Sequence, residues 1–225
     1  MRYAIYFCPA VDTELGRLGR NWLATAPSAI ELPGIRTERR DSLLADVRRY
    51  GWHATIRAPF PLAVDVTYDD LHRAVTALAQ TLAPFSLPLQ IDRLSDFLAL
   101  RPLTDSAPLD ALATTCVKAL MPLCAPLSDE ALRRRSVGLD ADELTLLKRY
   151  GYPYVLERYR FHMTLSAPAT ELEEQAMRQW LEPRVTELGP AWIDALSICR
   201  EAHPGDTFEL LERIPLNAPS KEHML

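Results

Sequence analysis

The apolar positions near the start of the chain follow first the period of a strand and then the period of a helix. Residues 2–8 alternate in a largely apolar run, which predicts a first β-strand. Leucines and a tryptophan then recur at helical spacing, which predicts a helix over residues 12–24. Asp12 or Thr13 is expected to be its N-cap, since both side chains can accept a hydrogen bond from the first turn.

The rest of the first half contains one irregular insertion followed by strands and a helix. Prolines and a glycine mark residues 26–48 as this insertion, with a short helical piece near its end. The pattern then predicts a strand over 52–58 that stops at Pro59, a helix over 68–83, and a hairpin of strands 85–91 and 96–101.

The second half repeats this order of elements. Its expected elements are a helix over 107–121, a charged helical insertion over 126–150, a strand over 158–166, a helix from Thr170 to 188, and a hairpin of residues 192–200 and 207–211. Two matching halves predict one α+β domain over residues 1–225, with two lobes packed about an approximate dyad.

Each half also carries the same short motif. Residues 49–55 read Arg-Tyr-Gly-Trp-His-Ala-Thr, and residues 158–164 read Arg-Tyr-Arg-Phe-His-Met-Thr. Both copies share Arg-Tyr, an aromatic residue directly before the histidine, and a threonine two positions after it. This agreement indicates a site assembled from two His-x-Thr segments, one from each half.

Alternation along a strand decides which side chains accompany each histidine. It places Thr55 and Arg57 on the face of His53. In the second copy, the shared face is expected to carry Arg160, His162, Thr164 and Ser166.

Two opposed imidazoles suit metal-free phosphodiester chemistry. One can act as general base and the other as general acid, because histidine titrates near neutral pH. Threonine hydroxyls can donate to phosphate oxygens, and arginine can stabilise the charge of the transition state. We therefore predict His53 and His162 as catalytic residues, without deciding which is the base. The predicted phosphate-binding residues are Thr55, Thr164, Arg57, Arg160, Ser166 and, from the first strand, Tyr6.

Charge distribution favours a small anionic substrate. The 225 residues carry a net charge of −5, which argues against a nucleic-acid-binding protein. Basic residues nevertheless outnumber acidic ones by six to three in residues 36–60 and by seven to four in residues 133–162. Positive charge therefore collects around both motifs, where a phosphate ester would bind.

Other classes of protein fit the sequence less well. No apolar run is long enough to span a bilayer, and the N-terminus has no charged leader, so we expect a cytoplasmic protein without membrane association. The four cysteines form no Cys-x-x-Cys pair, which argues against a disulfide framework or a structural zinc site. A catalytic zinc normally has three protein ligands, so two histidines predict no metal site, and we expect no cofactor.

The two motifs resemble the signatures of the 2H phosphoesterase superfamily, which is named for its paired His-x-Thr/Ser segments. Residues 150–155, Tyr-Gly-Tyr-Pro-Tyr-Val, with the second motif after them, are similar to a branch of that superfamily described as phosphonate metabolism proteins. The resemblance implies antiparallel sheets lining a central groove with helices outside, and cleavage of a small cyclic phosphodiester without metal. It gives His53 and His162 the acid and base roles and Thr55 and Thr164 the phosphate contacts. A ribose or nucleoside cyclic phosphate is the expected substrate, and the insertions at 26–48 and 126–150 are expected to form a lid.

Two alternatives remain open beside the cyclic phosphodiesterase. The first is a 2′,5′-RNA ligase or RNA end-processing enzyme, against which the acidic net charge argues. The second is a non-catalytic module that binds a nucleotide or phosphate. Both histidines are present, so the sequence contains no sign of lost catalysis.

Overall fold

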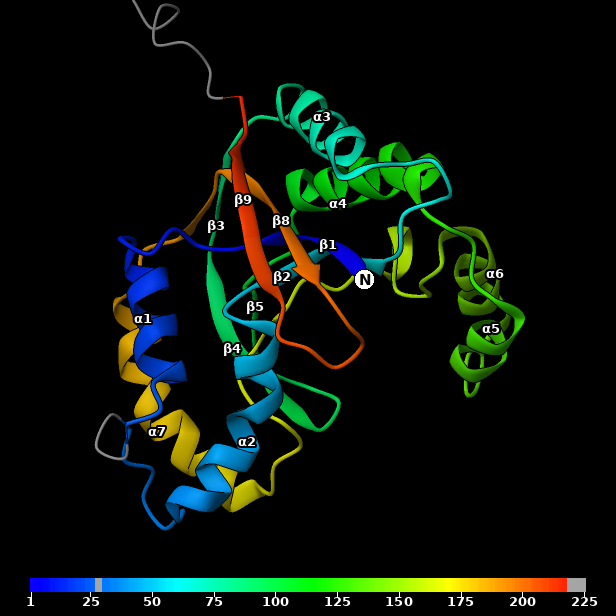
Figure 1. Cartoon of the computed structure of the whole chain (residues 1–225). Helices are drawn as coiled ribbons and strands as arrows, with labels where there is room; N and C mark the ends of the chain where they lie inside the picture. The colour runs from blue at the N-terminus through cyan, green and yellow to red at the C-terminus, as the bar shows by residue number, and fades with distance from the viewer. Residues whose placement is uncertain (27–29, 218–225) are drawn as a thin grey trace, which may run out of the picture.

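Antiparallel sheets lie at the centre of the molecule, and helices cover their outer sides (Figure 1). This computed structural model describes residues 1–26 and 30–217. In it, a four-stranded sheet has the order β2-β1-β8-β9, a three-stranded sheet has the order β4-β5-β6, and β3 pairs with β7. Each sheet takes strands from both halves of the chain, so the predicted α+β class and the two-lobed arrangement are confirmed. The strands are β1 (Arg2–Phe7), β2 (Ala54–Phe60), β3 (Phe85–Leu87), β4 (Leu89–Leu94), β5 (Phe97–Pro102), β6 (Met163–Thr164), β7 (Ala191–Ile193), β8 (Ala195–Glu201) and β9 (Glu209–Pro215).

Among the described residues, every α-helix except α2 begins after a residue whose side chain caps its first turn. Thr13 accepts a hydrogen bond from the backbone N–H of Gly16, and Thr170 forms a capping box with Glu173. The helices are α1 (Glu14–Leu23), α2 (Thr37–Tyr50), α3 (Tyr68–Ala79), α4 (Ala107–Leu120), α5 (Asp129–Arg135), α6 (Ala141–Tyr150) and α7 (Glu171–Glu187), with single 3₁₀ turns η1 (Met121–Leu123) and η2 (Leu156–Arg158).

The second motif forms much less strand than its alternation predicts. Only Ala99 and Leu100 of β5 pair with β6, so the expected strand over 158–166 shrinks to Met163–Thr164. Before β6, residues Leu156–Arg158 form the 3₁₀ turn η2 instead of extended strand. The His162 ring then forms a hydrogen bond with the Arg160 carbonyl. The first motif behaves similarly, because β2 begins at Ala54, one residue after His53. Both histidines therefore lie just before a strand instead of within one.

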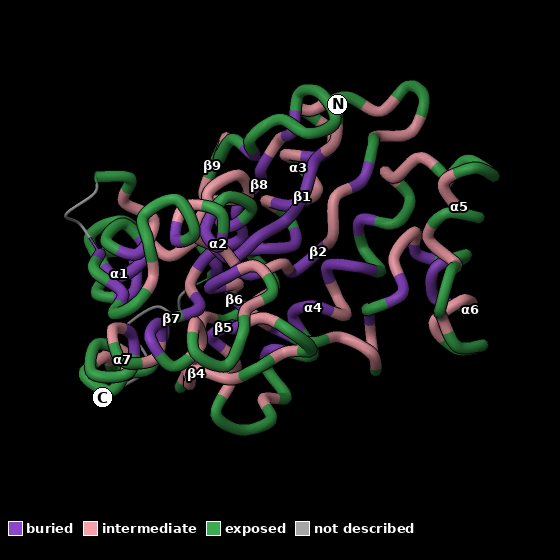
Figure 2. The backbone as a smooth tube through the Cα atoms, turned by 90° about the horizontal axis from the view of Figure 1, so that it is seen from below, coloured by how far each residue is buried: buried purple, intermediate pink, exposed green. Residues whose placement is uncertain are grey.

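The main hydrophobic core lies between the sheets and the helices around them. Figure 2 shows buried segments concentrated along β1, β2 and β8, and the residues Ile5, Ile198 and Leu100 of the sheets are fully buried. Helices α5 and α6 lie at the opposite end of the molecule from α1 and α7 (Figures 1 and 2). Within the described ranges, no helix is long and apolar enough to cross a membrane.

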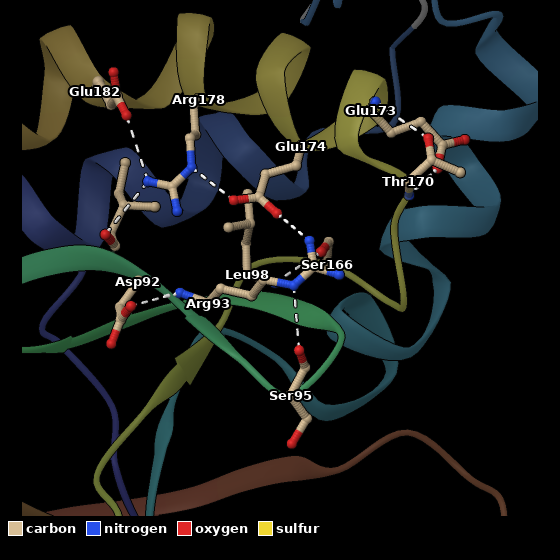
Figure 3. A network of polar contacts seen from close by, with 11 residues as sticks. Asp92, Arg93, Ser95, Leu98, Ser166, Thr170, Glu173, Glu174, Arg178 and Glu182 are labelled. Carbon is tan, nitrogen blue, oxygen red and sulfur yellow. Dashed lines mark hydrogen bonds and ion pairs between the residues drawn. The ribbon is translucent and has the colours of Figure 1, made fainter.

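A polar network fastens α7 to the hairpin of β4 and β5 (Figure 3). The Arg178 guanidinium donates to Glu174, and the same carboxylate accepts from Arg93 of β4 at 2.6 Å. Beneath this network, the Leu98 backbone N–H donates to the Ser166 hydroxyl at 3.3 Å. These bonds fix β5 beside the segment that carries the second motif.

Candidate active site

A cavity of about 650 Å³ lies between the two motifs. Tyr6, His53 and Thr55 line it from the four-stranded sheet, while Thr164 and Ser166 line it from the other lobe. The remaining wall includes Arg2 and Phe97, residues Asp46 and Val47 of α2, and Arg135, Tyr152 and Tyr154 in and after the second insertion. The structure thus brings five of the eight residues singled out from the sequence to one cavity wall.

The imidazole of His53 is fixed by a backbone bond. Its Nδ1 lies 2.9 Å from the Gly51 carbonyl oxygen, which can only accept, so Nδ1 carries the proton. The other nitrogen, Nε2, is left as the acceptor and lies 3.5 Å from the Thr55 hydroxyl. An unprotonated nitrogen beside a hydroxyl is an arrangement that general acid/base chemistry can use.

Burial keeps the ring of His53 neutral. It lowers the pKa of His53 to about 4, against a smaller opposing effect of the Gly51 carbonyl, and the charge of His162 lowers this pKa further. Part of the burial comes from Tyr6, whose ring stacks on the imidazole with centroids 3.9 Å apart. His53 is therefore an unprotonated base at neutral pH.

The imidazole of His162 repeats this arrangement. Its Nδ1 lies 2.8 Å from the carbonyl oxygen of Arg160, again two residues earlier in the chain. Burial lowers the pKa of His162, the Arg160 carbonyl opposes this, and the charge of Arg101 lowers it further. His162 is not among the residues that line the cavity, but it is near enough for its charge to act on His53. Both rings thus hold Nδ1 on the backbone and keep Nε2 for other partners.

The aromatic residues shared by the two motifs have structural roles. Trp52 donates from Nε1 to the Leu15 carbonyl at 3.0 Å and packs against Gly19 of α1. The Tyr159 hydroxyl donates to the Thr55 carbonyl at 2.9 Å, which ties the second motif to β2 of the first. Phe161 is buried in the main core.

The structure places Arg57 away from the cavity. In the pairing of β1 with β2, Tyr6 is opposite Thr55 while Ile5 is opposite Arg57, so Ile56 is an extra residue in a bulge. Paired residues share a face, and Ile5 faces the core, so the bulge turns Arg57 to the side opposite Thr55. The prediction that Arg57 shares a strand face with His53 and Thr55 is therefore wrong.

The buried Arg57 side chain instead joins the ends of two helices. It donates to the carbonyls of Val117, in the last turn of α4, and Tyr150, the last residue of α6. It also donates to the Cys124 sulfur at 3.0 Å. Helix C-termini carry partial negative charge and unsatisfied carbonyls, which accounts for a buried cation at this place.

The other predicted side chains divide between the cavity and the surface. Tyr6 and Ser166 line the cavity, and the Ser166 hydroxyl also accepts the Leu98 N–H. Arg160 is exposed and does not line the cavity, and its carbonyl holds His162. The Arg160 side chain therefore does not join Thr164 and Ser166 at the cavity, as the strand alternation predicted.

Three arginines near the site are absent from the sequence prediction. Arg101 lies two residues beyond Ala99, and Ala99 pairs with Thr164, so continuing this register puts Arg101 across from His162. Its guanidinium pairs with Asp92 at 2.6 Å, and its buried Nε has no hydrogen-bond partner among the described residues. Arg2 and Arg135 line the cavity itself. Only the pairing of strands could have identified Arg101, and a single sequence does not contain that pairing.

The second insertion contributes directly to the cavity wall. Arg135 ends α5, and its guanidinium donates to the Gly151 carbonyl after α6 at 2.9 Å. Tyr152 and Tyr154 follow, with their rings in an edge-to-face contact. From the first insertion, the last turns of α2 supply Asp46 and Val47. In the part of the chain that the structure describes, no group of three or more His, Cys, Asp or Glu side chains could hold a metal ion.

Comparisons with known proteins give two related sequences among the curated proteins. Each is named "Ribose 1,5-bisphosphate phosphokinase PhnN". The protein of Janthinobacterium sp. (strain Marseille) is 36% identical over 242 residues, which cover 100% of this chain and 52% of the relative. The protein of Laribacter hongkongensis (strain HLHK9) is 36% identical over 216 residues, which cover 93% of this chain and 50% of the relative. The chain therefore spans about half the length of the curated relatives it matches.

Two solved structures show a distant likeness. The crystal structure of TT0787 of Thermus thermophilus matches 97% of this chain and 99% of its own, with a TM-score of 0.48 and 15% identity. A crystal structure described as a phosphoesterase matches 96% of this chain and 98% of its own, with a TM-score of 0.42 and 13% identity. Neither likeness is close enough to carry an argument about function.

The family comparison covers most of the chain. The model described as "Protein of unknown function (DUF1045)" matches residues 55–209, a span that includes Thr55, the second insertion and the whole second motif. The chain belongs to the DUF1045 family.

Proposed function

We propose that this protein is a phosphodiesterase of the 2H type that hydrolyses a small cyclic phosphodiester with His53 and His162 as its acid/base pair. One observation carries this proposal. Each imidazole has its Nδ1 held by the carbonyl two residues earlier, which leaves both Nε2 atoms for proton transfer. His53 lines the cavity, and His162 is near enough for its charge to act on His53. Paired proton donors and acceptors are what an in-line displacement at phosphorus needs.

The different pKa shifts suggest which histidine is the base. His53 has its pKa lowered to about 4, so its Nε2 can accept a proton from water at neutral pH. That water attacks phosphorus, and the bond to one ester oxygen of the ring breaks. His162 then donates a proton to the leaving oxygen, after the bound phosphate anion has favoured its protonated form. The hydroxyls of Thr55 and Thr164 donate to the remaining phosphate oxygens, and Arg101 stabilises the added charge.

The name of the two relatives guides the choice of substrate. A phosphokinase for ribose 1,5-bisphosphate transfers a phosphoryl group, and nucleotide-dependent kinases commonly bind phosphates with a G-x-x-x-x-G-K-[ST] loop. No such loop occurs in this chain, because none of the lysines at 118, 148 and 221 follows a glycine. We assign the kinase activity of those relatives to the half that this chain does not match.

The half that does match would then act on a related sugar phosphate. Hydrolysis of a ribose 1,2-cyclic phosphate that also carries a 5-phosphate, with cleavage of the ester bond to O2, yields ribose 1,5-bisphosphate. This is the compound in the name of the relatives. We therefore propose a ribosyl cyclic phosphate as substrate and phosphonate metabolism as the setting, with a small phosphate ester as the binding partner.

A panel of cyclic phosphates tests this function. Ribose 1,2-cyclic phosphates, nucleoside 2′,3′-cyclic phosphates and 2′,5′-linked RNA are incubated with wild type, His53→Ala and His162→Ala, and products are followed by ³¹P NMR. We expect cleavage of a ribose cyclic phosphate by wild type, unchanged by EDTA, and a loss of about 10²–10⁴-fold in each variant. His72→Ala is the control, because His72 lies on α3 and pairs with Glu212 at the surface.

Two results would contradict the proposal. Full activity in either catalytic variant would remove the acid/base pair. Tight binding without cleavage of any member of the panel would favour the non-catalytic binding module, and selective action on RNA would favour the RNA end-processing enzyme.

A further inference from the structure

We propose that the cavity contains a second anion site, formed by Arg2 and Arg135, that binds a second phosphate group on the substrate. The inference rests on the proposed function and narrows its substrate class to sugar cyclic phosphates that carry a separate phosphate monoester. The site is distinct from the His53 and Thr55 end of the cavity, where the cyclic phosphate would react.

The position of Arg2 follows from strand geometry. Arg2 and Tyr6 lie four residues apart on β1, so they share a face of the strand at a spacing of about 13 Å. Tyr6 stacks on His53, and both residues and Arg2 line the same cavity. Arg2 is therefore on the histidine side of the sheet, with its backbone about four residues along β1 from the position that stacks on His53.

A buried carboxylate orients the Arg2 guanidinium. Arg2 pairs across the strands with Glu201 of β8, and its Nε and Nη2 contact one carboxylate oxygen at 2.6 and 2.5 Å. Glu201 is only 1% exposed, and its other oxygen accepts the Gly205 N–H at 2.9 Å. Two nitrogens of Arg2 are thus fixed, which directs the guanidinium and leaves Nη1 for a ligand.

Arg135 reaches the cavity from the other side. It is the last residue of α5 and donates from Nη1 to the Gly151 carbonyl, but it pairs with no carboxylate among residues 1–26 and 30–217. Burial lowers the pKa of Arg135, and the charges of Arg2 and Arg134 lower it further. A partly buried cation close to other cations, with only a carbonyl as partner, is stabilised when an anion binds between them.

The remaining charges of the wall do not neutralise this pair. Glu201 balances one guanidinium, and the carboxylate of Asp46 lies 3.4 Å from Arg49 and is largely exposed. One excess positive charge therefore remains where the cavity is lined by Arg2 and Arg135, and a phosphate monoester dianion supplies the complementary charge. The phenol groups of Tyr152 and Tyr154, which also line the cavity, can donate to the same group.

A matched pair of substrates tests the second anion site. Ribose 1,2-cyclic phosphate and its 5-phosphate differ only in the distal group, and kcat/KM is measured for each with wild type, Arg2→Gln, Arg135→Gln and the double variant. We expect wild type to prefer the 5-phosphate by about 10–100-fold, as charge-assisted hydrogen bonds allow, with the preference largely lost in the double variant. Arg135→Lys should restore part of it. Arg133→Gln, at an exposed position of the same helix, should retain the wild-type preference.

The ratio of the two kcat/KM values separates binding from misfolding, because a folding defect lowers both values together. Equal kcat/KM values in wild type would overturn the second anion site while leaving the proposed function intact. If wild type cleaves neither compound, the proposed function fails, and binding of ribose 5-phosphate is compared by calorimetry. Weakening of about tenfold in Arg135→Gln would then still uphold the site, and equal affinity would reject it.

Discussion

The ring of Tyr6 lies flat against the imidazole of His53, with centroids 3.9 Å apart and planes 28° apart. Tyr6 is opposite Thr55 in the pairing of β1 with β2, so strand register determines this contact. The stack removes water from one face of a proposed catalytic base. The pKa of His53, lowered to about 4 chiefly by burial, is therefore coupled to a residue of a different segment.

Replacing this ring should restore the basicity of His53. In Tyr6→Leu, water can approach the exposed face of the imidazole, so we expect the pKa of His53 to rise from about 4 toward its ordinary value. NMR titration of the His53 ring protons measures the change. Tyr6→Phe keeps the stacked ring and should leave the titration near that of wild type. A pKa that does not change in Tyr6→Leu would show that other neighbours provide the burial.

The lowered pKa also predicts the acidic limb of the pH–rate profile. A base that loses its function only when protonated gives an acidic decline of kcat/KM that is centred near pH 4. An ordinary histidine would give a decline centred about two pH units higher. The limb should be absent from the residual activity of His53→Ala, and its persistence there would assign it to another group.

The same shift has a defined sign for stability. The pKa of His53 is lower in the folded state than in the unfolded state, so the unfolded chain binds more protons between about pH 6.5 and pH 4. The stabilising contribution is complete above that window and is lost as the pH falls through it. We expect wild type to be more stable than His53→Gln above this window. Urea denaturation should show this difference in unfolding free energy becoming smaller as the pH falls from about 6.5 to 4.

Arg101 should control the proton affinity of His162. Its charge lowers the pKa of His162 in addition to burial, so Arg101→Gln is expected to raise that pKa. The proposed mechanism has Arg101 stabilise the charge of the transition state, so the same variant should also lower kcat by about 10–100-fold. NMR titration and steady-state kinetics test the two parts separately. Arg93→Gln is the matched control, because Arg93 lies on the adjacent strand but pairs with Glu174 on α7.

The motif histidines could be found from the sequence, but not all of their neighbours. The cavity is lined by His53 and by three hydroxyl residues near the motif histidines, Thr55, Thr164 and Ser166. These three could be found from the sequence because each lies within four residues of a motif histidine. Arg57 does not line the cavity, since the bulge at Ile56 reverses the alternation on which its prediction depended. A bulge depends on the pairing of two strands, and the local pattern of apolar residues did not indicate it.

The remaining site residues come from long-range pairing. Arg2 is separated by more than forty residues from the first motif, and Arg101 reaches His162 only through the pairing of β5 with β6. The α+β class and the hairpin of β8 and β9 follow from local patterns, so they were predictable. The expected strand over 85–91 instead divides into β3, which pairs with β7, and β4, which pairs with β5. The order β2-β1-β8-β9, which joins the first strand to strands from the end of the second half, is a tertiary property that the periodicity does not encode.

Arg57 should matter for stability more than for turnover. Arg57→Met keeps much of the volume but leaves the carbonyls of Val117 and Tyr150 without their donor. We expect the free energy of unfolding to fall by about 1–3 kcal/mol, with kcat/KM close to wild type. Urea denaturation and kinetics on one preparation distinguish the roles. A large loss of kcat/KM in a fully stable variant would return Arg57 to the phosphate-binding residues.

Gly19 offers a test of how α1 positions the first motif. A Cβ at this glycine would lie 2.3 Å from the Trp52 ring, and Trp52 directly precedes His53. Because alanine is the better helix former by about 0.8–1 kcal/mol, helix propensity alone predicts that Gly19→Ala stabilises the protein. The contact predicts the opposite, because the indole must move and its bond to the Leu15 carbonyl must break or bend.

We therefore expect Gly19→Ala to lower the free energy of unfolding by about 1–3 kcal/mol and to reduce kcat by displacing His53. Gly189→Ala is the control, since nothing lies within 4 Å of a Cβ built there. Thermal denaturation and kinetics of both variants give the answer. If Gly19→Ala were as stable and active as the control, the close packing of Trp52 on α1 would have no part in holding the base.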